Sequence, residues 1–191
     1  MTVPNGHAFP QITGCPPLSR PESRLTGVER TFSEDDIIVS KTDLKGIITY
    51  ANRTFLDVAS YTLPEIMNKP HNIVRHPGMP RVVFKLLWDT IARGDEIFAY
   101  VLNQAKNGDH YWVYAHVTPS FDEKGKIVGY HSNRRVPKRE GVKAIEPIYK
   151  LLLDKEKEFS SPKEGIAAAE KLMLDFLKSK DVSYERFVLS L

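Results

Sequence analysis

The sequence contains a single cysteine, Cys15, among its 191 residues. One thiol excludes an intramolecular disulfide and a cysteine-rich metal site, and it is typical of a reducing cytoplasm. No apolar run approaches the ~18 residues that a helix needs to cross a bilayer. The N-terminus has neither the basic nor the apolar region of a signal peptide. We therefore expect a soluble, cytoplasmic protein without a membrane span.

Sequence patterns of catalysis and of nucleic-acid binding are also missing. The chain has no glycine-rich phosphate loop, nucleophile elbow or catalytic triad pattern. No His-x-x-x-His motif or acidic pairing suits zinc or non-haem iron. Its 27 basic and 24 acidic residues nearly balance, with a net charge of +3. We interpret the one short basic group as a solvated strand end and expect neither an enzyme nor a nucleic-acid-binding protein; that group is Arg134, Arg135, Lys138 and Arg139.

The first half of the chain alternates strand and helix patterns. Hydrophobic residues make up 41% of the sequence, which is enough for a packed core. Residues 1–31 are rich in proline, glycine and serine, and we expect them to form an extended leader. A hairpin of two β-branched strands over 37–50 precedes Asn52, which is suited to cap a short helix over 53–60. An apolar stripe predicts a helix over 80–92 that ends at Gly94.

Three further strands are predicted over 96–105, 110–119 and 127–135, and Asn107-Gly108 marks the first hairpin turn. Two strands, several short helices and three strands predict an α+β domain over 32–137, with an antiparallel sheet and helices on one face. The middle strand places two sets of side chains on opposite faces: Tyr111, Val113, Ala115 and Val117 on one, and Trp112, Tyr114 and His116 on the other.

Residues 138–191 change to a helical pattern with two apolar stripes. Ser161, Pro162 and Glu164 form a helix start in which serine is the N-cap. This helical hairpin is too small to bury its own stripes. It must pack on the sheet domain, on its own copy in a dimer, or on a partner.

Three segments in order carry a resemblance to a known family. They are Asn52 after the first hairpin, the segment from Asn72 to Pro80 (Asn-Ile-Val-Arg-His-Pro-Gly-Met-Pro), and the strand that begins Lys-Asn-Gly-Asp-His-Tyr-Trp-Val at Lys106. Together with Trp88 in the helix between them, they resemble the PAS sensor domain of bacterial aerotaxis receptors over roughly Asp36 to Val136. The resemblance implies a PAS fold with a five-stranded antiparallel sheet and FAD in a pocket between sheet and helices. It assigns Asn52, Arg75, His76 and Trp88 to the pocket or its rim.

Two positions depart from the family pattern. The family's aspartate in the Arg-His-Pro-Asp segment is Gly78 here, which removes a hydrogen-bond acceptor. A tryptophan that often follows the central helix aligns near Ile97 or Phe98, which removes an indole stacking face. The chain also ends after its helical hairpin, and so resembles short stand-alone PAS proteins. We expect a redox or oxygen sensor that forms a homodimer and signals to a chemoreceptor or a histidine kinase.

The proposed pocket residues have structural alternatives. Arg75 and His76 could hold the diphosphate or the ring edge of FAD, or could cap the short helices around Asn72. Asn52 could bond the flavin ring or only cap its helix. Trp88 lies on an apolar stripe that faces the core, whether or not it also contacts a cofactor.

Two other functions are compatible with the sequence. One is a cofactor-free PAS adaptor, which the two departures favour. The other is a haem-based gas sensor, since related PAS domains can bind haem through a lone histidine such as His110, His116 or His131. The spacing of His71 and His76 we interpret as chance.

Overall fold

Five strands form one antiparallel sheet in the computed structural model, which describes residues 25–191. Residues 1–24, including Cys15 and most of the predicted leader, lie outside the described residues. The strand order is β2-β1-β5-β4-β3, so the N-terminal hairpin pairs with the last strand in sequence. The strands are β1 (Ile38–Thr42), β2 (Ile48–Ala51), β3 (Ile97–Gln104), β4 (His110–Phe121) and β5 (Ile127–Arg135).

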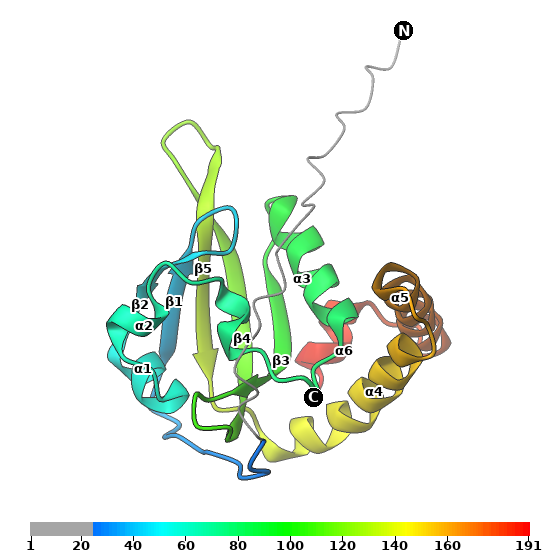
Figure 1. Ribbon diagram of the computed structural model, residues 1–191. Coiled ribbons are helices and arrows are strands. Elements are labelled where there is room, and N and C mark those ends of the chain that lie inside the picture. The colour runs from blue at the N-terminus through cyan, green and yellow to red at the C-terminus, as the bar shows by residue number, and fades with distance from the viewer. Residues whose placement is uncertain (1–24) are drawn as a thin grey trace, which may run out of the picture.

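The segment between β2 and β3 forms short helices that cover one face of the sheet (Figure 1). The core lies between these helices and the sheet, where Phe55, Ile66, Met79 and Tyr111 have no exposed surface. The predicted α+β architecture with helices on one face is therefore confirmed. The helices are α1 (Arg53–Ala59), α2 (Leu63–Ile66), the 3-10 helix η1 (His71–Val74) and α3 (Arg81–Ala92).

Asn52 is the N-cap of α1, as its position predicts. Its Oδ1 accepts hydrogen bonds from the Phe55 amide at 3.0 Å and from the Val39 amide at 2.9 Å. Its Nδ2 donates to the Ile37 carbonyl at 2.7 Å. One side chain therefore satisfies the free N-terminus of the helix and ties it to β1.

The β1–β2 turn comes close to α3 because its last residue is Gly46. This glycine has a φ of +76°, a conformation that L side chains rarely adopt. A Cβ atom there would lie 2.9 Å from Cη2 of Trp88. The turn and the indole ring can therefore meet only because this position has no side chain.

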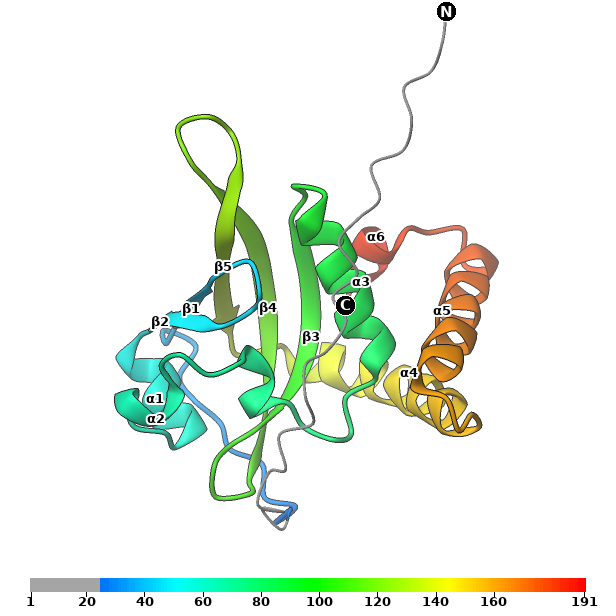
Figure 2. The same ribbon diagram turned by 45° about the horizontal axis from the view of Figure 1, so that its top comes forward.

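The C-terminal extension docks on the sheet domain, which is the first of the three alternatives left open by the sequence. Its helices lie beside β3 and α3 (Figures 1 and 2). The Tyr149 hydroxyl donates to the Tyr100 carbonyl at 2.8 Å, and the Val82 amide donates to Glu156 Oε1 at 2.8 Å. The helices are α4 (Arg139–Lys157), α5 (Pro162–Ser179) and α6 (Tyr184–Leu189). Within the described residues, none of the helices combines the length and apolar character that a membrane span requires.

Candidate ligand-binding site

A cavity of about 440 Å³ lies between α3 and the inner face of the sheet. This volume falls within the range of small-molecule sites, about 300–1,000 Å³. Helix α3 contributes one wall, with Phe84, Leu87, Trp88 and Ile91, and the β1–β2 turn contributes to the rim. The opposite wall is the sheet, where β3, β4 and β5 present Val101, Ala115, Val117 and Tyr130. Apolar and aromatic side chains therefore form much of both walls.

Arg75 and Trp88, two of the four predicted site residues, line this cavity. The Trp88 ring meets the Tyr130 ring edge-to-face, with centroids 5.5 Å apart. Arg75 Nη2 donates to the Met79 carbonyl at 3.0 Å, and its guanidinium lies 5.0 Å from the centroid of Phe84. These contacts fix an aromatic wall and a cation on one side of the cavity.

Asn52 and His76 are not among the residues that line the cavity. The Asn52 amide is engaged at the start of α1, as described above. His76 Nδ1 accepts a hydrogen bond from the Gly78 amide at 3.0 Å, so its ring folds back over its own turn. A Cβ atom at Gly78 would lie 2.9 Å from His76 Nδ1, so the glycine that replaces the family's aspartate leaves room for this ring. A ligand contact by Asn52 or His76 stays a prediction.

A polar cluster that the sequence analysis did not assign to the site also lines the cavity. It consists of Ser40 on β1, His71 in η1 and Arg134 on β5. Arg134 Nη2 donates to Ser40 Oγ and lies 3.1 Å from His71 Nε2. Ser40 Oγ lies 3.0 Å from the same His71 nitrogen. A chain of hydrogen bonds therefore runs from the guanidinium through the hydroxyl to the imidazole.

The expectation that Arg134 lies at a solvated strand end is wrong. Its exposed fraction is 2%, whereas its neighbour Arg135 is exposed on the opposite face of β5. Strand alternation gives the physical reason, because Tyr130, Ser132 and Arg134 share the face that covers the core. The same alternation could have identified Arg134 from the sequence. We know of no comparable signal for His71.

The cluster carries one buried positive charge. Burial lowers the pKa of Arg134 to about 10, so the guanidinium stays protonated at neutral pH. Burial, and then the charge of Arg134, lower the pKa of His71 to about 3, so the imidazole is neutral. No carboxylate within residues 25–191 forms an ion pair with Arg134. The positive charge is therefore not neutralised by the part of the chain that the structure describes.

Two buried polar atoms on cavity-lining residues have no hydrogen-bond partner within the described chain. They are Nη1 of Arg134 and Oγ1 of Thr42. Buried donors and acceptors are nearly always paired, and each unpaired one costs about 1–3 kcal/mol. The cavity thus combines apolar walls with polar lining residues, which is the composition of a site that binds a partly polar small molecule.

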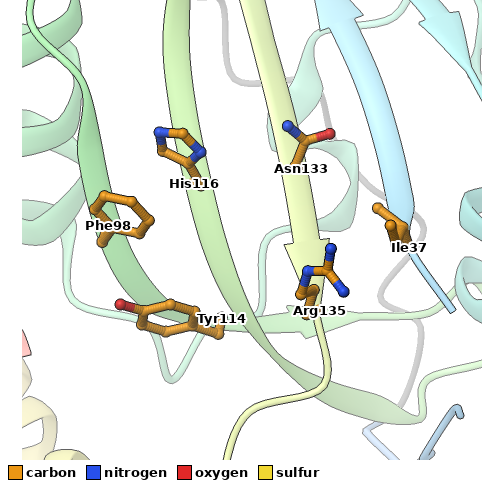
Figure 3. A pocket seen from close by; sticks show the side chains of 6 residues that line it. All are labelled: Ile37, Phe98, Tyr114, His116, Asn133 and Arg135. Carbon is orange, nitrogen blue, oxygen red and sulfur yellow. The ribbon is translucent and has the colours of Figure 1, made fainter. Parts of the chain in front are cut away.

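A second hollow, of about 350 Å³, lies on the opposite face of the sheet (Figure 3). There the Phe98 ring stacks on the His116 ring, with centroids 4.3 Å apart. His116 Nε2 lies 2.6 Å from Glu96 Oε2. The hollow faces away from α3, so two of the middle strand's outward residues, Tyr114 and His116, lie where strand alternation predicts.

The histidines considered for haem do not converge on the inner cavity. Only His131 of the three is among the lining residues of the cavity, and its Nε2 lies 3.0 Å from Asn133 Oδ1; His110 and His116 lie outside the lining. No group of three or more metal-ligating side chains occurs within residues 25–191.

Comparison with known proteins agrees with this architecture. Residues 48–134 match the family model of the PAS fold. The chain therefore contains a PAS domain. It is 47% identical to the aerotaxis receptor of Escherichia coli (strain K12) over 128 residues, which are 67% of this chain and 25% of the receptor. This match confirms the resemblance to aerotaxis-receptor PAS domains.

More distant relatives extend the comparison. The PAS protein is 27% identical to the nitrogen fixation regulatory protein of Klebsiella pneumoniae over 130 residues, which are 68% of this chain and 26% of that protein. The light-state structure of the blue-light photoreceptor Aureochrome1 LOV superposes with a TM-score of 0.50 and 26% identity, and covers 64% of this chain and 91% of that chain. A light-oxygen-voltage domain studied with a flavin analogue has a TM-score of 0.51 at 21% identity, which shows the common fold. The chain spans about a quarter of the length of the two curated relatives.

Proposed function

We propose that this PAS protein binds FAD in the inner cavity and reports redox or oxygen status to a signalling partner. The observation that carries the proposal is the cavity itself, where aromatic walls surround a buried cation and two unpaired polar atoms. The family resemblance supplies the identity of the cofactor, and the aerotaxis receptor at 47% identity supports it.

The lining residues fit the two chemically different parts of FAD. Phe84, Trp88 and Tyr130 offer aromatic surface to the flat, largely apolar ring system. Arg75 is only partly buried, so it suits the strongly hydrated diphosphate, for which arginine offers planar paired donors. Bound FAD would supply a reversible redox centre. Asn103, which is 4% exposed, would add a buried amide to the polar contacts of the cavity.

Helix α3 is the element that could pass a change in the cavity to the surface. Phe84 and Trp88 line the cavity, while Lys85 forms an ion pair with Glu170 on α5 at 2.8 Å. A change in cavity contacts would therefore bias the docking of the extension, and a coupling of about 1–3 kcal/mol is enough for such a switch. We propose a chemoreceptor or a histidine kinase in the cytoplasm as the partner.

A homodimer stays part of the proposal. We expected it because the leader and the helical hairpin both need burial. The structure buries the hairpin residues Ile145, Tyr149, Leu152 and Met173 within one chain. A dimer must therefore rest on other surfaces, and sedimentation of the purified chain will test it.

An absorption spectrum before and after dithionite tests the cofactor. We expect bands near ~450 and ~370 nm that bleach on reduction, because an oxidised flavin loses its extended conjugation when the ring is reduced. Chromatography of the released cofactor separates FAD from FMN. A colourless protein that also fails to bind added FAD would refute the proposal and favour a cofactor-free adaptor. A sharp band near ~400 nm would instead identify haem.

Matched tryptophan variants locate the cofactor. Trp88→Phe removes indole surface from the cavity, while Trp112→Phe makes the same change on the opposite face, where the indole stacks on Tyr149 at 6.2 Å. We expect Trp88→Phe to reduce FAD affinity and Trp112→Phe to leave it unchanged. Equal affinities for both variants would show that the flavin lies elsewhere.

A further inference from the structure

Arg134 is a buried cation without a buried anion. Its exposed fraction is 2%, and it forms no ion pair within residues 25–191. Removing a charge from water is costly, and proteins normally offset that cost with a partner of opposite charge. An arginine in this position therefore reduces the stability of the empty protein unless something else in the cavity interacts with it.

The neighbours of Arg134 give it only partial compensation. Its Nε donates to Ser132 Oγ at 3.0 Å, and its guanidinium carbon lies 4.7 Å from the centroid of Phe55. Nη2 is engaged by Ser40, and Nη1 has no partner within the described chain. None of the groups described around the charge is thus an anion, and the unpaired donor belongs to a residue that lines the cavity.

The neighbours, in turn, do not need Arg134. Ser40 Oγ lies 3.0 Å from His71 Nε2, so the serine hydroxyl can donate to the imidazole without the guanidinium. Ser132 is partly exposed and can bond water. Removal of the arginine therefore leaves no buried polar group without a partner. The loss of a purely structural arginine would instead leave the buried groups that it binds without hydrogen-bond partners.

We propose that the Arg134 guanidinium, on a residue that lines the cavity, contacts the cavity's occupant directly at an electron-rich group that carries or gains negative charge. In the setting of the proposed function, on which this part rests, that group is the polar edge of the flavin ring. The diphosphate is an unsuitable candidate, because Arg134 lies deep in the cavity and burial of a doubly charged group costs far more than burial of a flat ring. Arg75, at the more exposed end, is better placed for the diphosphate.

A fixed positive charge at the ring edge has a consequence for redox chemistry. Two electrons from a donor such as dithionite, with one proton from water, would convert a bound, neutral oxidised ring into an anion. The guanidinium would attract this anion more strongly than the neutral ring, so Arg134 would raise the midpoint potential of a bound flavin.

Three variants of the full chain test the proposal. Arg134→Met removes the charge and keeps an unbranched apolar chain, and Arg134→Gln removes the charge and keeps a donor. Arg135→Gln is the matched control, because it removes the same charge from the next residue on the same strand but on the opposite face. For each protein we would measure urea unfolding without cofactor, FAD affinity by fluorescence titration, and the midpoint potential against a reference dye.

We expect Arg134→Met to unfold without cofactor at the same or a higher urea concentration than the native chain. We also expect it to bind FAD at least tenfold more weakly. Where flavin remains bound, its oxidised form should be favoured at least tenfold, which for two electrons is a fall of about 30 mV in the midpoint potential. Arg135→Gln should match the native chain in all three measurements.

The outcomes separate the two proposals. If the native chain binds no flavin, the proposed function fails; in that case, stabilisation by Arg134→Met would still show that the residue is costly in the empty protein. If the native chain binds FAD and both Arg134 variants bind it equally well with the same midpoint potential, the inference about Arg134 is overturned. Loss of the native fold in both variants would assign Arg134 to the structure and would also overturn the inference.

Discussion

The docking of the C-terminal extension on α3 can be weakened by one substitution, Glu156→Ala. Glu156 is 9% exposed, and its Oε1 accepts a hydrogen bond from the Val82 amide at 2.8 Å. The N-cap of α3 is Pro80, whose side chain makes no capping hydrogen bond. A carboxylate from α4 therefore caps the N-terminus of α3, where the helix dipole also favours a negative charge.

The expected effect follows from what each substitution leaves behind. Alanine leaves the amide of Val82, which is 1% exposed, without a hydrogen-bond partner, and an unpaired buried donor costs about 1–3 kcal/mol of stability. Glu156→Gln keeps the oxygen acceptor and loses only the attraction between the charge and the helix dipole, about 0.3–1 kcal/mol. Glu146→Ala on the same helix removes an exposed carboxylate, and such surface changes usually stay within about 0.5 kcal/mol.

Tryptophan fluorescence during urea unfolding can report the docking. The chain has two tryptophans, and Trp112 stacks on Tyr149 of α4. In a Trp88→Phe background, the remaining fluorescence therefore reports the contact between sheet and extension. With a slope of about 2 kcal/mol per molar urea, Glu156→Ala should lower the midpoint by about 0.5–1.5 M, and Glu156→Gln by less than half as much. Equal midpoints for Glu156→Ala and Glu146→Ala would refute the capping role of Glu156.

Three further predictions concern other parts of the structure. The folded-state pKa of His71, about 3, lies below its unfolded value of about 6.5, so the unfolded chain takes up this proton first and stability is lost as the pH falls from about 6.5 towards 3. Between pH 6 and 4.5, the free energy of unfolding measured with urea should fall by about 2 kcal/mol more for the native chain than for His71→Gln. The same pH dependence in both proteins would contradict the burial of a neutral imidazole. Asn52→Ala removes three hydrogen bonds and should lower the free energy of unfolding by about 2–3 kcal/mol, which corresponds to a melting temperature lower by about 5–10 °C. An unchanged FAD stoichiometry at low temperature would identify the residue as structural. Loss of flavin from a folded variant would identify it as a ligand contact. Gly165→Ala places a Cβ atom 2.4 Å from the Glu156 carbonyl oxygen, so α5 must move away from α4 at a cost of about 1–3 kcal/mol, and faster amide hydrogen exchange in the extension should accompany it.

Local patterns predicted most of the secondary structure. The strand over 127–135 has the predicted bounds, and Ser161 caps α5 as expected. These features depend on neighbouring residues, through strand alternation, turn chemistry and capping. The position of the extension could not be predicted in this way, because it depends on long-range contacts such as the one between Tyr149 and Tyr100.

The site was predicted less completely than the fold, for a related reason. Arg75 and Trp88 line the cavity, and they belong to segments that carry the family pattern. Ser40, His71 and Arg134 come from three elements that are distant in sequence, and only the pairing of β1 with β5 brings Ser40 opposite Ser132. The position of Arg134 within a group of four basic residues also suggests that it is exposed to solvent. In this case the alternation of the strand was the better guide, because it separates Arg134 from Arg135.

Helix α3 joins the cavity to the extension within a single rigid element. Its Phe84 and Trp88 side chains meet the cavity, while the Val82 amide and the Lys85 ammonium meet carboxylates of α4 and α5. A helix of 12 residues cannot shift one of these faces without the other, because its backbone hydrogen bonds fix their relation. Any occupant that shifts the backbone of α3 at Trp88 therefore changes the distances at Glu156 and Glu170. The extension is thus placed where it would sense the cavity through two polar contacts, each weak enough to be reset by a few kcal/mol.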